Sequence, residues 1–143
     1  MTSGVPGRAM LVVDASCLYE VITEGPFAEE TRNILATSDE LAAPAIIDVE
    51  IVSLIRRDLL SSTLAPSRAD IAMAELNDWC GERFPVRPMN ERVWQLRSNV
   101  RTWDAYYVAL AEYLSVPLVT LDRRLNASQG PLCSFIVPCR EPE

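Results

Sequence analysis

Short apolar runs alternate with longer amphipathic stretches along most of this chain. Residues 10–13, 41–43, 118–121 and 134–137 have the length and composition of buried strands, and residues 84–86 form a brief extended segment. The stretches between them have helical spacing of apolar side chains. This alternation predicts an α/β fold, a three-layer α/β/α sandwich whose mainly parallel sheet is covered on both faces.

The expected helices follow from the same pattern and from its punctuation. Pro44 and Pro66 stand where helices begin, because proline suits the first helical turn. Asn90 and Asp104 have the side chains of helix caps. We therefore expect helices at 31–37, 45–60 and 67–80, a helix from Asn90 through Val93, Leu96 and Val100, and a helix at 105–114.

The chain has 143 residues, enough for one domain with a sizeable core. We expect that domain at residues 10–139, after a flexible extension at residues 1–9. No apolar run approaches the about 20 residues of a membrane helix. Asp14 also interrupts the first apolar run too early for a signal peptide. The expectation is a cytoplasmic protein without a membrane segment.

Two residue types are absent, and their absence excludes several classes of enzyme. Without histidine there is no Ser-His-Asp triad, imidazole base or imidazole metal ligand. All 13 basic residues are arginines, so the lysine of a P-loop or of a Schiff base is absent too. Carboxylates, hydroxyls, thiols and arginines remain. Carboxylates are hard oxygen ligands, which favour Mg²⁺ or Mn²⁺ over zinc.

Four acidic residues occupy positions where they can meet. Asp14 and Asp122 directly follow apolar runs, so each is expected at the carboxyl end of a strand, where open α/β sheets bind ligands. Asp104 begins a predicted helix, and Glu50 lies within another. Converging carboxylates repel each other unless a cation lies between them. The pattern thus favours a metal site, provided that the four residues converge.

Other interpretations of the same residues remain open at this level. Asp14, Asp104 and Asp122 can each be only the N-cap of the following helix. Glu50 lies on an apolar helix surface, but Asp48 is nearly as embedded, so periodicity does not choose between them. An interhelical salt bridge to Arg56 or Arg57 is a further possible role for an acidic residue on this surface.

The chain from residue 10 to about residue 138 resembles the PIN-domain ribonucleases, and most closely the VapC-type toxins of bacterial toxin–antitoxin pairs. VVDAS is similar to the first motif of that family, with Asp14 and a supporting hydroxyl at Ser16. PAIIDVEIVSLIRR is similar to the second and places Glu50 at the acidic position. WDAYYVALAEYLSVPLVTLDRRL is similar to the third and fourth together, with Asp104, Asp122 and the companion hydroxyl Thr120.

The resemblance implies a function: endonucleolytic cleavage of RNA dependent on Mg²⁺ or Mn²⁺, leaving a 5′-phosphate and a 3′-hydroxyl. Asp14 and Asp104 are then expected to hold the principal ion, while Glu50 and Asp122 orient its waters or a second ion. Asn126 stands where some relatives carry a further acidic residue, which implies weaker binding of a second metal. The resemblance also implies a cognate antitoxin and a homodimer; the apolar helix near residues 46–60 is a candidate groove for the antitoxin.

RNA must also be held, although the net charge of −7 is unfavourable for binding phosphates. Bound metal neutralises part of that charge, and arginines can act locally. The candidates for contacting phosphates are Arg97, Arg101, Arg123 and Arg124, with Trp94 or Trp103 stacking a base. Solvated arginines and core tryptophans are the alternative.

Two other classes of protein compete with the ribonuclease interpretation. A receiver-type phospho-transfer domain needs an Asp pair after the first strand and a lysine near the last, and this chain has neither. A PIN fold kept only as a catalytically silent interaction module is the second. The four acidic residues argue against that module, because converging charges are costly without a function for them.

Overall fold

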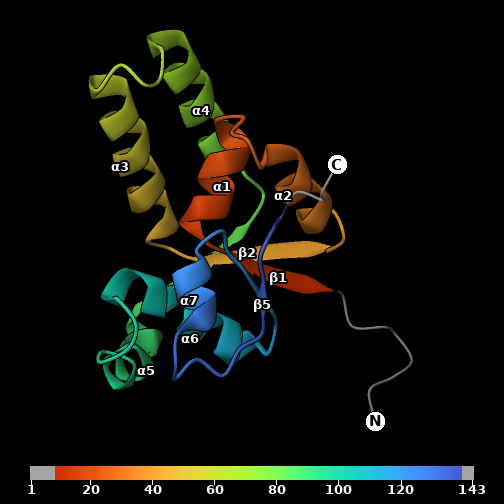
Figure 1. Ribbon diagram of the computed structural model, residues 1–143, viewed down its shortest axis with the longest axis vertical. Helices are drawn as coiled ribbons and strands as arrows, with labels where there is room; N and C mark the ends of the chain where they lie inside the picture. The colour runs from red at the N-terminus through yellow and green to blue at the C-terminus, as the bar shows by residue number, and fades with distance from the viewer. Residues whose placement is uncertain (1–8, 140–143) are drawn as a thin grey trace.

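The computed structural model describes residues 9–139 (Figure 1). The extension predicted for residues 1–9 lies almost entirely outside this range. Within it, five parallel strands form one sheet in the order β3-β2-β1-β4-β5. The predicted α/β class and parallel sheet are confirmed. The strands are β1 (Met10–Val13), β2 (Glu40–Pro44), β3 (Glu82–Phe84), β4 (Leu118–Val119) and β5 (Phe135–Ile136).

Helices cover both faces of this sheet. Figure 1 shows α1 to α4 on one side and α5 and α6 on the other. Helix α6 packs against β1, β2 and β4, whereas α1 packs against α2, α3 and α4. This is the expected three-layer sandwich. The helices are α1 (Ala15–Ile22), α2 (Ala28–Leu35), α3 (Ile47–Leu60), α4 (Pro66–Asp78), α5 (Asn90–Gln95), α6 (Thr102–Leu114) and α7 (Arg123–Ala127), with a 3₁₀ turn at Arg87–Met89.

The central strand explains where a ligand can bind. β1 lies between β2 and β4, and the chain reaches β2 through α1 but returns to β4 only after several further elements. The order of strands therefore reverses between β1 and β4. In open parallel sheets the crevice beyond the carboxyl ends of two such strands is the usual binding site. Asp14 follows β1 at this crevice, and Thr120 follows β4.

Pro44 and Asn90 differ from the roles that the sequence predicts for them at helix starts. Pro44 is the last residue of β2, and α3 begins at Ile47. Pairing of β2 with β1 ends at Ala42, so the missing N–H of Pro44 costs no hydrogen bond to β1. Helix α5 does begin at Asn90, but Asn90 is not its N-cap, because the 3₁₀ turn runs directly into α5 and leaves Asn90 in helical conformation. Its side chain accepts a hydrogen bond from the Tyr106 hydroxyl at 2.6 Å instead.

Helix α6 begins earlier than predicted, and α5 ends earlier. The N-cap of α6 is Arg101, with an extended backbone, so Asp104 is the third residue of the helix and not its cap. There its carboxylate still benefits from the helix dipole. Helix α5 ends at Gln95, although Leu96 and Val100 are buried as the apolar pattern predicts. The pattern identified core positions correctly but extended the helix too far.

The core lies between the sheet and its two helical layers. From α6, Tyr107, Val108 and Leu110 are almost fully buried, and β1 contributes Val12 and Val13 with no exposed surface. A helix that is apolar on most of its faces suits such a position between the sheet and another helix. The first turn of α6 is less buried and reaches the carboxyl edge of the sheet, which places Asp104 beside the crevice.

The buried face of α6 predicts a clear difference in stability between two leucine truncations. Leu110→Ala should lower the free energy of unfolding by about 2–5 kcal/mol, because it leaves a cavity in a packed core. Leu60→Ala, at a position on α3 that is 66% exposed, should change it by less than about 0.5 kcal/mol. Urea unfolding followed by circular dichroism measures both. Equal losses would contradict this placement of α6.

Candidate active site

Asp14 is the most buried carboxylate of the candidate site, with only 6% of its surface exposed. It follows β1 directly and caps α1, since its Oδ1 accepts a hydrogen bond from the Cys17 amide at 3.1 Å. The Ser16 hydroxyl donates to the same oxygen at 2.5 Å, and the Thr120 hydroxyl donates to Oδ2. The capping interpretation is therefore correct for Asp14, yet capping uses only one of its three hydrogen bonds.

Ser16 and Thr120 tie the two strand ends together. The Ser16 hydroxyl also accepts from the Leu121 amide at 3.2 Å, and the Thr120 hydroxyl accepts from the Asp122 amide at 3.0 Å. The loop after β4 is thus fastened to the start of α1. These are the two supporting hydroxyl residues that the family resemblance implies, and both donate hydrogen bonds to the Asp14 carboxylate.

Asp122 is the second residue that both caps a helix and faces the crevice. Its Oδ1 accepts from the amides of Arg124 at 2.9 Å and Leu125 at 3.3 Å, which caps α7. Its Oδ2 lies 3.7 Å from Nη2 of Arg101. A second nitrogen of that guanidinium, Nε, lies 3.4 Å from Oδ2 of Asp104. Arg101 therefore bridges two acidic residues from different parts of the chain.

Glu50 approaches the same group of carboxylates from α3. Its Oε1 is buried and has no hydrogen-bond partner in the described part of the chain, and the same holds for the Tyr107 hydroxyl. The two side chains are neighbours. Burial, and then the nearby charges of Asp104 and Asp14, raise the pKa of Glu50 to about 7, although the adjacent Tyr107 hydroxyl lowers it. An unpaired buried oxygen is costly, and it points to a missing partner.

Asp48 has a different role from Glu50. It forms a two-pronged ion pair with Arg83 on β3, with N···O distances of 3.0 and 3.1 Å. This partner removes the ambiguity that helical periodicity leaves between Asp48 and Glu50. Arg57 likewise pairs with its neighbour Asp58 at 3.0 Å.

The carboxylates influence each other's ionisation. Burial raises the pKa of Asp14, with a further increase from Asp104 and opposing effects of its three hydrogen bonds. Burial also raises the pKa of Asp104, where Arg101 lowers it and Asp122 raises it. These shifts connect Asp14, Glu50, Asp104 and Asp122 into one electrostatic cluster. Within residues 9–139, however, no three acidic or thiol side chains already stand as a finished set of metal ligands.

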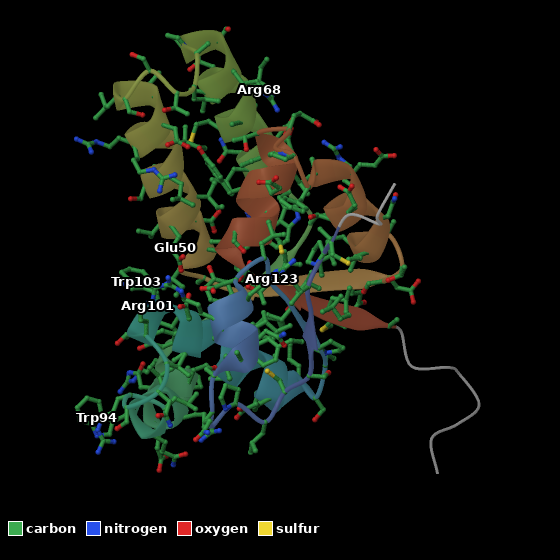
Figure 2. All side chains as sticks on the ribbon, viewed as in Figure 1. Glu50, Arg68, Trp94, Arg101, Trp103 and Arg123 are labelled. Carbon is green, nitrogen blue, oxygen red and sulfur yellow. The ribbon has the colours of Figure 1, made fainter. Side chains whose placement is uncertain are left out.

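The predicted RNA-contacting arginines divide into two groups. Arg101 and Arg124 line a hollow of about 250 Å³ together with Asp104 and Asp122. Arg123 is exposed at the start of α7, close to this edge of the sheet (Figure 2). Arg97 is separate: its guanidinium lies 4.6 Å from the ring centre of Trp94, which Figure 2 shows away from Glu50 and Arg101.

Trp94 and Trp103 are not core residues. Trp94 is 68% exposed and Trp103 is 54% exposed. Because α5 ends at Gln95, Trp94 and Arg97 do not share one continuous helix with Arg101. Sequence reasoning also missed Tyr107. Its spacing of three residues from Asp104 on a helix places both on one face, and that spacing could have identified it.

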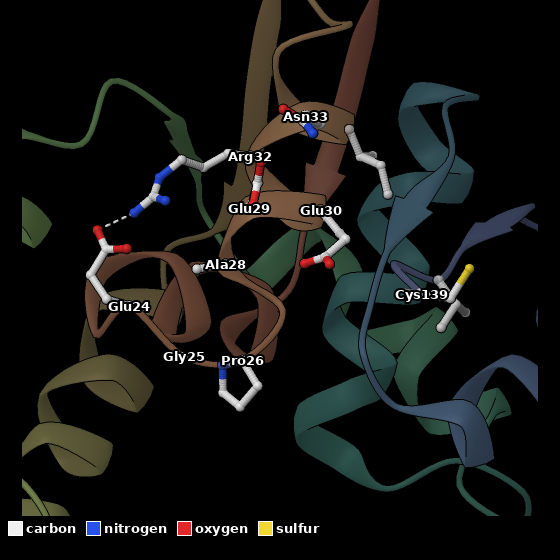
Figure 3. Close-up of a pocket in the computed structure, with 11 residues that line it drawn as sticks. Glu24, Gly25, Pro26, Ala28, Glu29, Glu30, Arg32, Asn33 and Cys139 are labelled. Atoms are coloured by element: carbon white, nitrogen blue, oxygen red, sulfur yellow. Dashed lines mark hydrogen bonds and ion pairs between the residues drawn. The ribbon is translucent and has the colours of Figure 1, made fainter. Parts of the chain in front are cut away.

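A larger hollow, of about 1000 Å³, lies away from the carboxylate cluster (Figure 3). It is formed by α2 and the segment before it, with Val137 and Cys139 opposite. Its charged side chains include Glu24 and Arg32, which pair with each other. Three of the four candidate catalytic carboxylates instead line the smaller crevices beside the sheet edge.

A model of the PIN domain family matches residues 11–129. The chain belongs to the PIN-domain family. Ribonuclease VapC1 of Mycobacterium tuberculosis is 39% identical over 126 residues, which span 87% of this chain and 94% of VapC1. Ribonuclease VapC9 of the same organism is 35% identical over 129 residues, spanning 90% and 98% of the two chains. These similarities extend over nearly the whole PIN domain.

Solved structures show the same PIN fold at lower identity. The FitAcB structure from Neisseria gonorrhoeae superposes with a TM-score of 0.69 at 19% identity, covering 90% of this chain and 98% of that one. VapBC2 from Rickettsia felis, bound to a DNA fragment from its promoter, gives 0.67 at 11% identity, with 90% and 98% covered. Among residues 9–139 of the present PIN domain, every helix is too short or too polar to cross a membrane.

The raised pKa of Glu50 predicts that stability falls with rising pH when no metal is added. A carboxyl whose folded pKa lies above its unfolded value binds more protons in the folded state. Its favourable contribution is therefore present below about pH 4.5 and is lost as pH rises to about 7. In EDTA, Glu50→Gln should be more stable than wild type at pH 8 by about 1–2 kcal/mol, a range reduced for partial solvent screening.

Urea unfolding at several pH values between 4.5 and 8 measures this effect. Glu29→Gln, at an exposed position on α2, is the matched control and should keep the wild-type slope. Adding Mn²⁺ should raise the stability of wild type at pH 8 more than that of Glu50→Gln, because a ligand that binds the folded state stabilises it. Identical slopes for wild type and Glu50→Gln would show that Glu50 ionises as an exposed residue does.

Proposed function

We propose that this protein is a divalent-metal-dependent endoribonuclease of the VapC type, acting as the toxin of a toxin–antitoxin pair. The observation that carries the proposal is the gathering of Asp14, Glu50, Asp104 and Asp122 at the carboxyl edge of the sheet. These residues come from four separate segments. The charge of Asp104 raises the pKa of both Asp14 and Glu50, and the charge of Asp122 raises that of Asp104, which supports their proximity. Relatives such as Ribonuclease VapC1 are named as ribonucleases, which supports cleavage of RNA as the reaction.

The cluster fits a hard divalent cation. All four groups offer carboxylate oxygens, which Mg²⁺ and Mn²⁺ prefer. The buried Glu50 oxygen has no partner among the described residues, and its neighbouring acids disfavour its ionisation. Asp14 and Asp104 are the proposed principal ligands, with Glu50 and Asp122 completing the site. A bound ion there lowers the pKa of water and neutralises charge at the scissile phosphate.

The surrounding side chains position these ligands. Hydrogen bonds from Ser16 and Thr120 hold the Asp14 carboxylate in one orientation, as such outer contacts commonly do for ligands. Arg101, which is 79% exposed, is free to turn from the acids toward a phosphate oxygen. Arg123 and Arg124 extend the cationic surface beside it, and Arg97 offers a more distant contact for the RNA backbone.

The bond changes need no side-chain nucleophile. Water adds to phosphorus and the bond from phosphorus to the 3′ oxygen breaks, which leaves a 5′-phosphate and a 3′-hydroxyl. The water loses a proton and the leaving 3′ oxygen gains one. Glu50, as part of the proposed metal site, would orient the attacking water. The lack of histidine is therefore no obstacle to this reaction.

A cognate antitoxin and a second copy of the chain are the proposed protein partners. Solved relatives include toxin–antitoxin complexes, such as one from Klebsiella pneumoniae with a TM-score of 0.64. Exposed apolar side chains along α3 and α4 suit an antitoxin surface; they are Val52, Leu59, Leu60 and Ile71. An enzyme that cleaves cellular RNA meets its substrate in the cytoplasm, which we propose as its compartment.

Asp14→Asn should abolish cleavage while keeping the fold. Asparagine retains an oxygen that can cap α1 but removes the charge that the cation needs, so we expect activity to fall at least about a hundredfold. Purified protein, free of antitoxin, is incubated with total cellular RNA and Mg²⁺ or Mn²⁺, and fragments are resolved on gels. EDTA should have the same effect as the substitution. Equal fragment patterns for wild type and Asp14→Asn would indicate a contaminating nuclease.

A well-folded wild-type preparation that cuts no RNA with either metal would favour the silent interaction module. Calorimetric titration with Mn²⁺ then separates the two remaining cases. Binding without cleavage would leave the metal site intact and remove only the proposed reaction, whereas no binding would remove both.

Arg101→Gln should change metal binding and RNA binding in opposite directions. Its guanidinium competes with a cation for Asp104 and Asp122, so its removal should tighten Mn²⁺ binding by about three- to tenfold. Loss of a phosphate contact should raise the KM for RNA about tenfold. Calorimetry and initial-rate kinetics measure the two effects. Arg56→Gln, exposed on α3, is the control and should change neither; weaker Mn²⁺ binding by Arg101→Gln would refute the competition.

A further inference from the structure

A cleft of about 510 Å³ adjoins the carboxylate cluster, and the proposed reaction does not account for it. It lies between the first half of α3 and the start of α6. Figure 2 shows Glu50, Arg101 and Trp103 close together at this junction. Its lining residues are Val49, Glu50, Ser53, Leu54, Arg101, Trp103 and Asp104.

Trp103 forms one wall and is unusually available for a ligand. It directly precedes Asp104 in the first turn of α6, and 54% of it is exposed. The other two tryptophans are each covered by a guanidinium, Trp79 by Arg83 and Trp94 by Arg97. Within residues 9–139, no cation lies over the Trp103 ring. A large indole beside a reactive centre therefore has a free aromatic face.

The part of the lining that comes from α3 has complementary chemistry. Val49, which is 61% exposed, and Leu54 supply apolar side chains, and Ser53 adds a hydroxyl. A flat ring stacked on Trp103 in this cleft would have these side chains among its other neighbours. The Arg101 guanidinium and the acids Glu50 and Asp104 border the same cleft. A ring bound there is thus next to the place where a phosphate would react.

We infer that this cleft is a nucleobase-binding subsite, in which Trp103 stacks on an unpaired base adjacent to the scissile phosphate of RNA. The inference rests on the proposed function and adds to it a residue that selects an unpaired base beside the cleaved bond. Stacking needs a base face that is not already covered by neighbouring bases of a duplex, so the base must be unpaired and unstacked. A largely apolar cleft in which a few polar groups set the orientation is typical of small-ligand sites.

The inference is tested by RNA binding in EDTA, where the RNA stays intact. Fluorescence anisotropy of labelled short single-stranded RNA oligonucleotides gives Kd for wild type, Trp103→Ala, Trp103→Phe and Tyr113→Ala. Trp103→Ala should weaken binding about 10- to 100-fold, as expected for loss of one stacked base. Trp103→Phe should bind with intermediate affinity. Tyr113→Ala removes an exposed aromatic side chain near the opposite end of α6, outside the cleft, and should stay within about twofold of wild type.

Three further readouts separate stacking from a merely structural effect. Unlabelled RNA should quench indole fluorescence in wild type and Trp94→Phe, but much less in Trp103→Phe. An oligonucleotide with abasic sugars should bind wild type as weakly as intact RNA binds Trp103→Ala. With Mn²⁺ present, Trp103→Ala should raise KM and leave kcat within about threefold of wild type.

Unchanged RNA affinity in a folded Trp103→Ala, or tight binding of abasic RNA, would overturn the subsite. Normal RNA binding with lost affinity for the cognate antitoxin would also overturn it and assign the cleft to a protein partner. Failure of the proposed function gives a different pattern. In that case no RNA is cleaved with Mg²⁺ or Mn²⁺, while Trp103-dependent binding and quenching in EDTA still support the subsite.

Discussion

The candidate site depends on how the buried carboxylate of Asp14 is held. Burial of a carboxylate is costly unless hydrogen bonds compensate for the water it loses. Here the compensation comes from the Cys17 amide and from the hydroxyls of Ser16 and Thr120. One donor comes from the loop after β4 and two from the start of α1. The same contacts that make the charge tolerable therefore join two strand ends into one rigid edge.

The remaining acids gather around this fixed point from helices. Asp104 comes from the first turn of α6 and Glu50 from α3, and both lie close enough to affect the ionisation of their neighbours. Such a cluster is unfavourable without positive charge. Arg101 supplies some of it through its contacts with Asp104 and Asp122, but its side chain is mostly exposed and its two ion pairs are long. The cluster is therefore suited to accept a stronger cation.

For Asp14 and Asp122 the sequence offers helix capping and metal binding as alternative roles. In the folded chain the two roles are compatible. A carboxylate has two oxygens with several acceptor sites. In Asp122, one oxygen caps α7 and the other faces Arg101. A residue that follows a strand and caps the next helix is thus already at the sheet edge where ligands bind. A cap at this position is a local signal for the site as well as for the helix.

Local sequence patterns predicted the ends of helices and strands less reliably than they predicted the buried positions. The periodicity of Val93, Leu96 and Val100 marks buried positions, and all three are buried, yet the helix ends at Gln95. A turn can keep apolar side chains in the core without helical backbone, so burial alone does not define a helix. Pro44 shows the reverse case: its chemistry suits a helix start, but strand pairing determines its place at the end of β2.

By itself the sequence determined the parallel α/β class, the positions of Asp14 and Asp122 after strands, and the motifs shared with the PIN-domain family. These depend on spacing within short segments, where backbone geometry sets the period. Only the tertiary structure decided that Asp48 pairs with Arg83 while a Glu50 oxygen stays unpaired. It alone also placed Trp103 in an open cleft. These contacts depend on which side chains are brought together by segments far apart in the sequence. The periodicity within one short segment carries no information about that.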